Sequence, residues 1–290
     1  ATTTTTPNNE DRKHWVIGET NFNSKPKPLT KELQEALETN THPIEEQDEL
    51  GRGVFTTREI PLHRLFCQWQ GKASGFTKGR DRSFHFGTQE YNIIGMISHL
   101  GPQLGVADGI ALANLLKKNG QVTAVFTGEG GTSEGDFHEA LNVASVWQLP
   151  VIFCIENNGY GLSTPTNEQY HCRHLADRGK GYGIESFIVD GNNILEVYDK
   201  VSKLATSVRK KPRPILIEFK TFRMRGHEEA SGTKYVPQEL LSTWSKKDPV
   251  LNFRSYLMNL GIPLNTDSTL KGQTVFLAER CAELMHDNII

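Results

Sequence analysis

The chain has 290 residues, of which 37% are hydrophobic, and its formal net charge is −2. This length allows one large or two modest domains, and the apolar content is sufficient for a hydrophobic core. The nearly balanced charge argues against a protein that binds nucleic acid or an anionic membrane surface, and no apolar run has the length of a membrane-spanning helix.

The cysteines point to a reducing compartment. Cys67, Cys154, Cys172 and Cys281 show no paired spacing, and Cys154 lies within an apolar run. Buried, unpaired thiols are typical of cytoplasmic proteins, or of matrix proteins if the source is a mitochondrion. The segment His171–His174 contains two histidines and a cysteine but lacks a second pair of ligands, which favours a surface loop over a zinc site.

The two ends of the chain differ in character from its middle. Residues 1–50 are polar and begin with a run of threonines, which predicts an N-terminal extension that is partly disordered, with one short helical pattern around residues 31–38. We expect a single α/β domain over residues 51–262. Residues 263–290 are expected to form a C-terminal helical segment.

The middle of the chain alternates between helical and strand-like segments. A helix is expected over residues 100–118, a strand over 122–127, a helix over 134–148 and a second strand over 150–155. The pattern continues with a strand over 185–190, a helix over 194–209 and a strand over 215–219, and after Pro237 the chain reads as amphipathic helix. This alternation predicts an α/β fold whose mostly parallel sheet carries helices on both faces.

Two polar sequences follow neighbouring strands of the predicted sheet. Gly128-Glu129-Gly130 comes after the first strand, and Asn157-Asn158 comes after the second. The carboxyl ends of parallel strands are where open α/β sheets bind ligands. Carboxylate, amide and carbonyl oxygens together suit Mg²⁺, and a helix amino end beside them favours a diphosphate. Gly-Glu-Gly alone is equally consistent with an ordinary loop, but its combination with Asn-Asn favours a metal–diphosphate site.

Two commoner phosphate motifs are absent from this segment. A dinucleotide fingerprint that starts at Gly128 requires glycine where the chain has Ser133. A P-loop that starts at Gly130 requires Gly-Lys-Ser or Gly-Lys-Thr where the chain has Gly135-Asp136-Phe137. NAD and ATP are therefore disfavoured as ligands.

The pattern closely resembles the thiamin diphosphate motif, Gly-Asp-Gly followed after about 26 residues by Asn-Asn. The segment is similar to the α subunits of the decarboxylating component of 2-oxo acid dehydrogenase complexes, and Glu129 with residues 163–170 resembles the branched-chain (2-oxoisovalerate) type. The resemblance implies a thiamin-diphosphate-binding fold of the diphosphate-type domain. It also implies that Glu129, Asn158 and the carbonyl of Tyr160 hold Mg²⁺, while the N–H groups of Gly130 and Gly131 cover the cofactor diphosphate.

The loop after the last predicted strand contains a second group of candidate residues. Arg223, Arg225 and His227 follow that strand, so the loop is expected at the same edge of the sheet. His227 is our candidate for a catalytic proton donor and for a ligand of the diphosphate. It falls where the resembled family has a loop histidine beside the cofactor. Because Glu228 stands where animal members carry a regulatory serine, that phosphorylation switch is expected to be absent.

Further cofactor contacts follow from the resemblance alone. Arg58 resembles the family arginine that binds the terminal phosphate, although Thr57 replaces the usual tyrosine before it. Ser98 and Leu100 resemble residues that approach the cofactor by backbone contacts. Pro102 replaces a threonine at a potassium site of animal members, so potassium is not expected. His85 matches a loop near the active-site entrance, with a structural role equally plausible.

The resemblance implies the α subunit of a 2-oxo acid dehydrogenase, which binds Mg²⁺ and thiamin diphosphate for oxidative decarboxylation of a branched-chain 2-oxo acid. In that family a glutamate of the β subunit activates the cofactor, and the acyl group passes to a lipoyl domain of a dihydrolipoyl acyltransferase. A β partner in an α₂β₂ heterotetramer is therefore expected. Two alternatives stay open: a pyruvate or acetoin dehydrogenase α subunit, and a non-catalytic cofactor-binding or assembly subunit.

Overall fold

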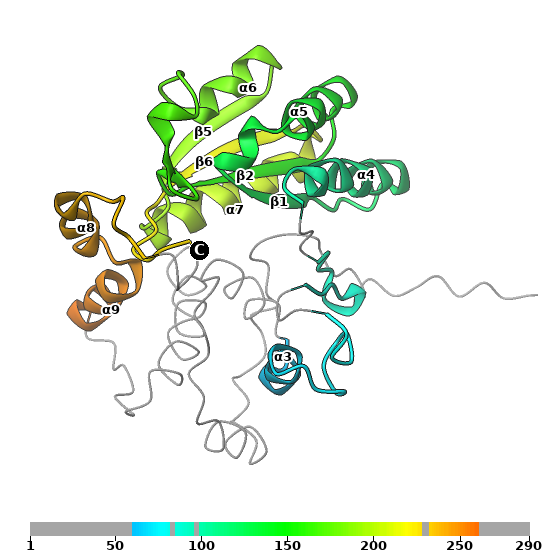
Figure 1. Cartoon of the computed structure of the whole chain (residues 1–290). Coiled ribbons are helices and arrows are strands. Elements are labelled where there is room, and N and C mark those ends of the chain that lie inside the picture. The colour runs from blue at the N-terminus through cyan, green and yellow to red at the C-terminus, as the bar shows by residue number, and fades with distance from the viewer. Residues whose placement is uncertain (1–59, 82–84, 96–98, 228–231, 261–290) are drawn as a thin grey trace, which may run out of the picture.

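A four-stranded parallel sheet forms the centre of the molecule in the computed structural model, which describes residues 60–81, 85–95, 99–227 and 232–260 (Figure 1). Its strands are β1 (Thr123–Gly128), β2 (Val151–Asn157), β5 (Glu185–Asp190) and β6 (Ile215–Lys220), in the spatial order β1-β2-β6-β5. The three neighbouring pairs are all parallel. The predicted parallel sheet is therefore confirmed, and its four strands lie within one or two residues of their expected positions.

Helices and short turns complete the described structure. The helices are α3 (Leu62–Trp69), α4 (Pro102–Lys117), α5 (Gly135–Trp147), α6 (Arg178–Gly181), α7 (Ile194–Lys210), α8 (Gln238–Ser245) and α9 (Pro249–Asn259). Single 3₁₀ turns cover Gln89–Tyr91, Gly130–Ser133 (η3), Thr166–Glu168 and Leu175–Asp177 (η5), and a small antiparallel pair joins β3 (Tyr160–Gly161) to β4 (Thr164–Pro165). Within the described residues, no helix is long and apolar enough to cross a membrane.

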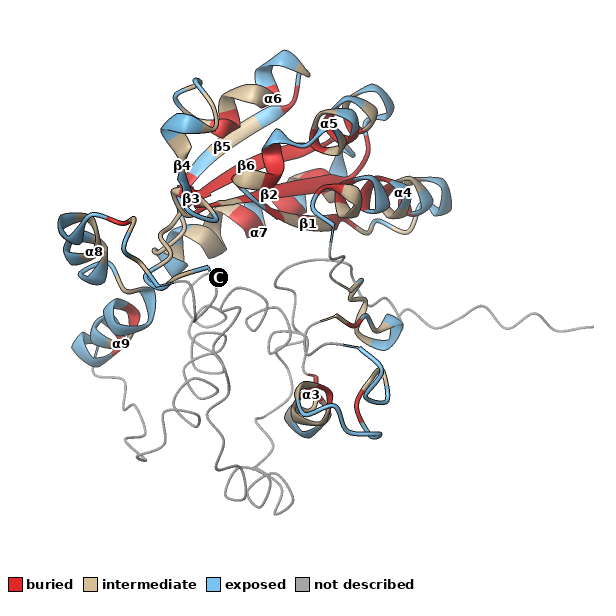
Figure 2. Ribbon diagram, viewed as in Figure 1, coloured by how far each residue is buried: buried red, intermediate tan, exposed pale blue. Residues whose placement is uncertain are grey.

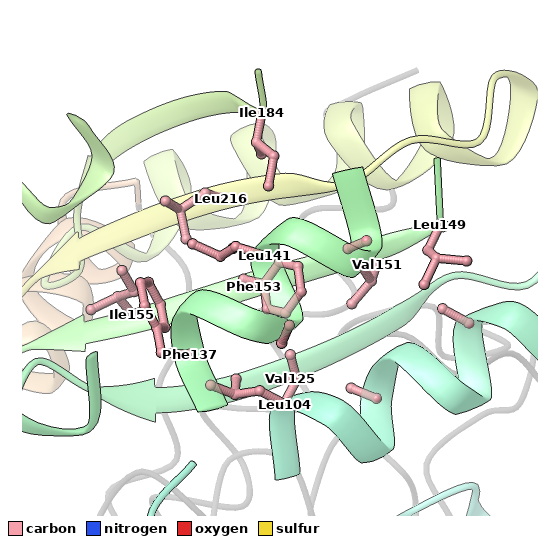
Figure 3. Close-up of a cluster of buried hydrophobic side chains, with 14 of the residues drawn as sticks. Leu104, Val125, Phe137, Leu141, Leu149, Val151, Phe153, Ile155, Ile184 and Leu216 are labelled. Atoms are coloured by element: carbon pink, nitrogen blue, oxygen red, sulfur yellow. The ribbon is translucent and has the colours of Figure 1, made fainter. Parts of the chain in front are cut away.

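Each face of the sheet is covered by helices, which explains why the central strands are apolar on both sides (Figure 2). On one face, Phe153 and Leu216 pack with Leu141 of α5 and Leu104 of α4 (Figure 3). On the other face, alternate residues of the same strands, including Cys154 and Ile217, pack against Val201, Leu204 and Val208 of α7. The prediction of helices on both faces is thus confirmed.

Local signals explain where the last helices begin. The chain after Pro237 reads as one helical region, but the structure divides it into α8 and α9. Pro249 lacks a backbone N–H and is tolerated only in the first turn of a helix, so a new helix starts there. Asp248 caps that helix, since its side chain accepts a hydrogen bond from the N–H of Leu251 at 2.8 Å.

Several sequence predictions fall outside the described residues. The N-terminal extension with its short helix and the segment 263–290 belong to this group. Helix α3 and the β3–β4 pair, by contrast, are described but were not predicted. The strands β3 and β4 have two residues each, too few for a periodic pattern, whereas α3 carries apolar residues at helical spacing (Leu62, Leu65, Phe66 and Trp69) that the sequence reasoning overlooked.

Candidate metal and diphosphate site

The two predicted polar sequences meet at one edge of the sheet. Glu129 follows the last residue of β1, and Asn158 follows the last residue of β2, the parallel neighbour of β1. The backbone N–H of Asn158 donates to Oε2 of Glu129 at 2.8 Å. A single hydrogen bond thus joins the Gly-Glu-Gly turn to the Asn-Asn turn, as their placement on adjacent strand ends predicts.

Glu129 is a buried carboxylate, with only 2% of its surface exposed. Burial disfavours its charged form and raises its pKa above the ordinary value for glutamate. Hydrogen bonds from backbone N–H groups, that of Asn158 first among them, and the positive charge of Arg223 oppose this rise in pKa. A desolvated carboxylate of this kind is a favourable ligand for a divalent cation, whose charge compensates the cost of burial.

The turn after β2 presents the other two predicted ligands. The side-chain Oδ1 of Asn158 accepts a hydrogen bond from the N–H of Tyr160 at 3.1 Å. Gly159 between them has a φ of +92°, a conformation that favours glycine. Its carbonyl accepts a hydrogen bond from the N–H of Thr166 at 3.1 Å, which fixes the turn against the segment after β4. Glu129, Asn158 and Tyr160 are therefore brought together.

The glycines after Glu129 allow a close approach of backbone segments. Residues Gly130–Ser133 form η3, and a side chain at position 131 would collide with the hydroxyl of Thr127. A Cβ atom at position 130 would lie 3.4 Å from the Cα of Gly161, so the turns after β1 and β2 touch here. Nη1 of Arg178 also donates to the carbonyl of Thr132 at 2.5 Å, and this contact fixes η3 from the side of α6.

The loop after β6 approaches the same site through Arg223. Nη1 of Arg223 lies 3.4 Å from Nδ1 of His227, and Nη2 donates to the hydroxyl of Tyr235 at 3.0 Å and to the carbonyl of Leu162. The charge of Arg223 is also close enough to Glu129 to lower the pKa of that carboxyl. His227 is exposed, and Arg223 lies between it and the candidate site at Glu129.

The other predicted cofactor contacts are only partly covered by the structure. Arg58 and Ser98 lie outside the described residues. Leu100 is 61% exposed and lies two residues before α4, whose N-cap residue Gly101 lies beside Asp136 at the start of α5. His85 is half-buried, and its Nδ1 has no hydrogen-bond partner among the described residues. Nothing in the described structure assigns a ligand to His85.

Two residues of the site were missed by the sequence reasoning. Asn157 is buried, and its Nδ2 donates to Oε1 of Glu218 at 2.7 Å and to the hydroxyl of Tyr170 at 2.9 Å. Glu218 lies in the middle of β6 and is fully buried. A carboxylate inside an apolar strand is a signal that the sequence does contain, because such a residue requires partners in the fold.

A hollow of about 440 Å³ lies away from these residues. It is formed by the turn between β5 and α7 and by helix α9, and its lining includes Asp190, Lys247 and Tyr256. None of the predicted metal or diphosphate ligands lines it, so it does not mark the candidate site.

Comparison with known proteins agrees with the geometry. The sequence profile described as "Dehydrogenase E1 component" matches residues 33–275. The mitochondrial 2-oxoisovalerate dehydrogenase subunit alpha of Caenorhabditis elegans is 39% identical over 213 residues, which are 72% of this chain and 49% of that protein. The human subunit of the same name is 37% identical over 212 residues, 72% of this chain and 47% of that protein.

The chain spans about half the length of the curated relatives it matches. A solved structure of a putative thiamin diphosphate-dependent enzyme from Mycobacterium smegmatis aligns with a TM-score of 0.35 and 19% identity, over 43% of this chain and 23% of that one. The profile match extends over most of the sequence, and its range includes the candidate site at the carboxyl ends of β1 and β2. The chain belongs to the dehydrogenase E1 component family.

Proposed function

We propose that this chain is the α subunit of a 2-oxo acid dehydrogenase that acts on a branched-chain 2-oxo acid and binds Mg²⁺ with thiamin diphosphate. The observation that carries the proposal is the 2.8 Å hydrogen bond from the N–H of Asn158 to Glu129, which joins the two halves of the motif. The names of the similar C. elegans and human subunits support the branched-chain substrate.

The donor set fits a hard divalent cation. Glu129 offers a buried carboxylate, Asn158 an amide oxygen and Tyr160 a backbone carbonyl, and carboxyl and carbonyl oxygens are the ligands that Mg²⁺ takes. A carboxylate oxygen accepts more than one partner, so the hydrogen bond from Asn158 leaves Glu129 able to bind a metal.

The remaining cofactor contacts are proposed from the same site. The N–H groups of Gly130 and Gly131 would face the diphosphate, in a segment that has no room for a side chain at position 131. Arg58, Ser98 and Leu100 would add contacts from the N-terminal half of the domain. His227 would bind the diphosphate or donate a proton to the reacting group, because an imidazole can act as a hydrogen-bond donor and as a general acid.

Bound thiamin diphosphate would supply the electron sink for decarboxylation of the 2-oxo acid. The chain's own residues would orient the diphosphate, hold the metal and bring His227 to the reaction. Activation of the cofactor requires a glutamate that we assign to a β subunit. We propose that α and β form an α₂β₂ heterotetramer, which transfers the acyl group to the lipoyl domain of an acyltransferase, in the cytoplasm or in the matrix of a eukaryotic source.

The test is reconstitution with a β subunit from the same source organism. Calorimetry would measure the binding of thiamin diphosphate with Mg²⁺. Reduction of an artificial electron acceptor would compare the turnover of 3-methyl-2-oxobutanoate, pyruvate and acetoin at equal concentrations, because acetoin has no carboxyl group and its cleavage releases no CO₂. The proposal expects tight binding and fastest turnover of the branched substrate. Faster turnover of pyruvate or acetoin would assign one of these substrates instead. Binding without turnover beside a competent β chain would identify a non-catalytic subunit.

A further inference from the structure

A second buried carboxylate lies beneath the metal site. Glu218 is in β6, between β2 and β5, and none of its surface is exposed. Its neighbours along the strand, Ile217 and Phe219, are buried and apolar. A carboxylate at such a position costs free energy unless its oxygens are fully hydrogen-bonded, and well-packed apolar residues often stabilise a fold as well as a buried charge does. The stability of the fold therefore does not by itself explain why a carboxylate occupies this position.

The contacts of Glu218 identify what it holds in place. Oε1 accepts hydrogen bonds from Nδ2 of Asn157 at 2.7 Å and from Nζ of Lys220 at 3.0 Å. Oε2 accepts a hydrogen bond from the backbone N–H of Ala176 at 3.0 Å. Lys220 is partly exposed, whereas Asn157 is 3% exposed. Of the two side-chain partners of Glu218, Asn157 is thus the buried one, and the backbone N–H of Ala176 makes the second buried contact.

Asn157 in turn shapes the turn that presents the predicted metal ligands. Its Oδ1 accepts a hydrogen bond from the N–H of Gly159 at 3.2 Å, and its carbonyl accepts one from the N–H of Thr221 at 3.0 Å. Asn158 and Tyr160, on either side of Gly159, are two of the three proposed metal ligands. The side-chain amide of Asn157 therefore connects Glu218 below to the turn above.

We propose that Glu218 is a positioning residue for the metal–diphosphate site: it fixes the side-chain amide of Asn157, which sets the turn from Asn157 to Tyr160 so that Asn158 and the carbonyl of Tyr160 face Glu129. The Asn-Asn pair is held by two buried carboxylates from the strands on either side of β2. Glu129 accepts from the backbone of Asn158, and Glu218 accepts from the side chain of Asn157. This inference rests on the proposed function.

The pair requires a carboxylate at position 218 because two N–H donors face its two oxygens. A glutamine there has one acceptor and one donor group. Whichever way its amide is turned, its NH₂ group meets the NH₂ of Asn157 or the N–H of Ala176. Glu218→Gln therefore changes the shape of the side chain very little, but it breaks one buried contact that involves a charge.

The experiment uses the full-length protein assembled with its β subunit and takes Mn²⁺ as the probe, because Mn²⁺ accepts the same oxygen ligands and its free form is visible by electron paramagnetic resonance. The dissociation constant of Mn²⁺ is measured with thiamin diphosphate present. Glu218→Gln is expected to weaken Mn²⁺ binding by about 10-fold or more. Activity of the variant should recover when Mn²⁺ is raised to saturation, because the residue acts through ligand placement rather than on the reaction itself.

A matched control and a rescue separate this role from general stability. Lys220→Met removes the other side-chain partner of Glu218 but keeps Asn157 bound, so Mn²⁺ affinity should change by less than about twofold. The double variant Asn157→Asp with Glu218→Gln reverses the direction of the hydrogen bond and should regain affinity over Glu218→Gln alone. A lower melting temperature with an unchanged affinity in Glu218→Gln would reduce the residue to a stabilising role and overturn the proposal.

The remaining outcomes are also decisive. If Glu218→Gln does not fold, Glu218→Asp provides the second route, because it keeps the charge but shortens the side chain and so withdraws the carboxylate from Nδ2 of Asn157. Its Mn²⁺ affinity should fall several-fold, and an unchanged affinity would overturn the proposal. Failure of the unaltered complex to bind Mn²⁺ with thiamin diphosphate would overturn the proposed function. If the unaltered complex and the Glu218→Gln complex both bind Mn²⁺ normally, the proposed function stands and only the positioning role of Glu218 is overturned.

Discussion

Oε2 of Glu129 and the backbone N–H of Asn158, 29 positions apart in the sequence, are joined by a 2.8 Å hydrogen bond at the carboxyl ends of β1 and β2. Because the bond uses the backbone of Asn158, it survives any change of that side chain. The amide oxygen of Asn158 and the carboxylate of Glu129 are therefore separable contributions to one site, and each can be removed by itself.

Asn158→Ala should remove one metal ligand and leave the fold intact. The variant loses the hydrogen bond from the N–H of Tyr160 to Oδ1 but keeps the bond from its own backbone to Glu129. Mg²⁺ tolerates poor geometry badly, so cofactor affinity in the α/β complex should fall by roughly tenfold or more. Calorimetry with thiamin diphosphate and Mg²⁺ measures this, and Asn167→Ala at an exposed neighbouring position is the control. Unchanged affinity in Asn158→Ala would contradict the metal assignment.

Gly131→Ala should displace the segment that is proposed to cover the diphosphate. The new Cβ atom would collide with the hydroxyl of Thr127, so η3 must shift. We expect about a tenfold loss of cofactor affinity by calorimetry on the complex, from roughly 1.4 kcal/mol of lost binding free energy. Gly135→Ala is the matched control, because a Cβ atom there meets only ordinary contact distances at the start of α5.

A second substitution tests the physical reason. Thr127→Ala removes the hydroxyl group that causes the collision, so the double variant with Gly131→Ala should recover most of the affinity. If affinity stays low in the double variant, the loss in Gly131→Ala has another cause. If Gly131→Ala binds the cofactor normally, the close approach at position 131 has no part in binding.

The burial of Asp108 in α4 should make the stability of the fold depend on pH. This residue is 5% exposed, and neither carboxylate oxygen has a hydrogen-bond partner among the described residues. Burial raises its pKa to about 7 from 3.8. Below about pH 4 the carboxyl group is protonated in both the folded and the unfolded chain, so its ionisation does not lower the stability of the fold. As the pH rises to about 7 the unfolded chain loses this proton first, so the folded state loses stability.

Asp108→Asn should therefore stabilise the protein most at high pH. Above pH 7 the gain in unfolding free energy is expected to be roughly 2–4 kcal/mol, and near pH 5 it should shrink by about half. Urea unfolding between pH 5 and pH 8 measures both values. Asp199→Asn, at a carboxylate with 48% of its side chain exposed, is the control and should show no such trend. A gain that is constant with pH would mean that Asp108 acts through packing and not through its charge.

The sheet was predictable because its signals are local. Each strand is a short apolar run, and helices α5 and α7 between the strands are long enough to show their period, so β1, β2, β5 and β6 were placed within one or two residues. The order β1-β2-β6-β5 and the registers depend on contacts between distant segments, and local patterns do not determine them. The short β3–β4 pair carries no periodic pattern and was missed for that reason, whereas α3 was overlooked although its apolar residues follow a helical spacing.

Only part of the candidate site, the proposed metal ligands, could be predicted from the sequence. Glu129 and Asn158 were found because their spacing matches a turn after each of two neighbouring strands. Asn157 and Glu218 were not paired, because they are 61 positions apart and only the fold makes β6 the neighbour of β2. The contact between Arg223 and His227 likewise depends on how the loop after β6 folds back. Arg58 and Ser98 stay predictions, since they lie outside the described residues.

Substitution of His227 tests whether this residue takes part in the reaction, as proposed. Its side chain is exposed, and its contact in the described structure is with Arg223, so His227→Ala should leave folding and the melting temperature unchanged. If the imidazole donates a proton during the reaction, CO₂ release by the α/β complex should fall by about 100-fold or more. The loss should lie mainly in kcat, since the residue would act in the transition state.

Arg223 provides the comparison that isolates this role. Arg223→Met removes the hydrogen bonds to Tyr235 and to the carbonyl of Leu162, and it also removes a positive charge close to Glu129. This variant should lose cofactor affinity as well as activity, whereas His227→Ala should keep most of its affinity by calorimetry. Similar losses of affinity in both variants would make His227 a ligand of the diphosphate instead of a proton donor. Full activity of His227→Ala would exclude it from the reaction and return the loop to a structural role.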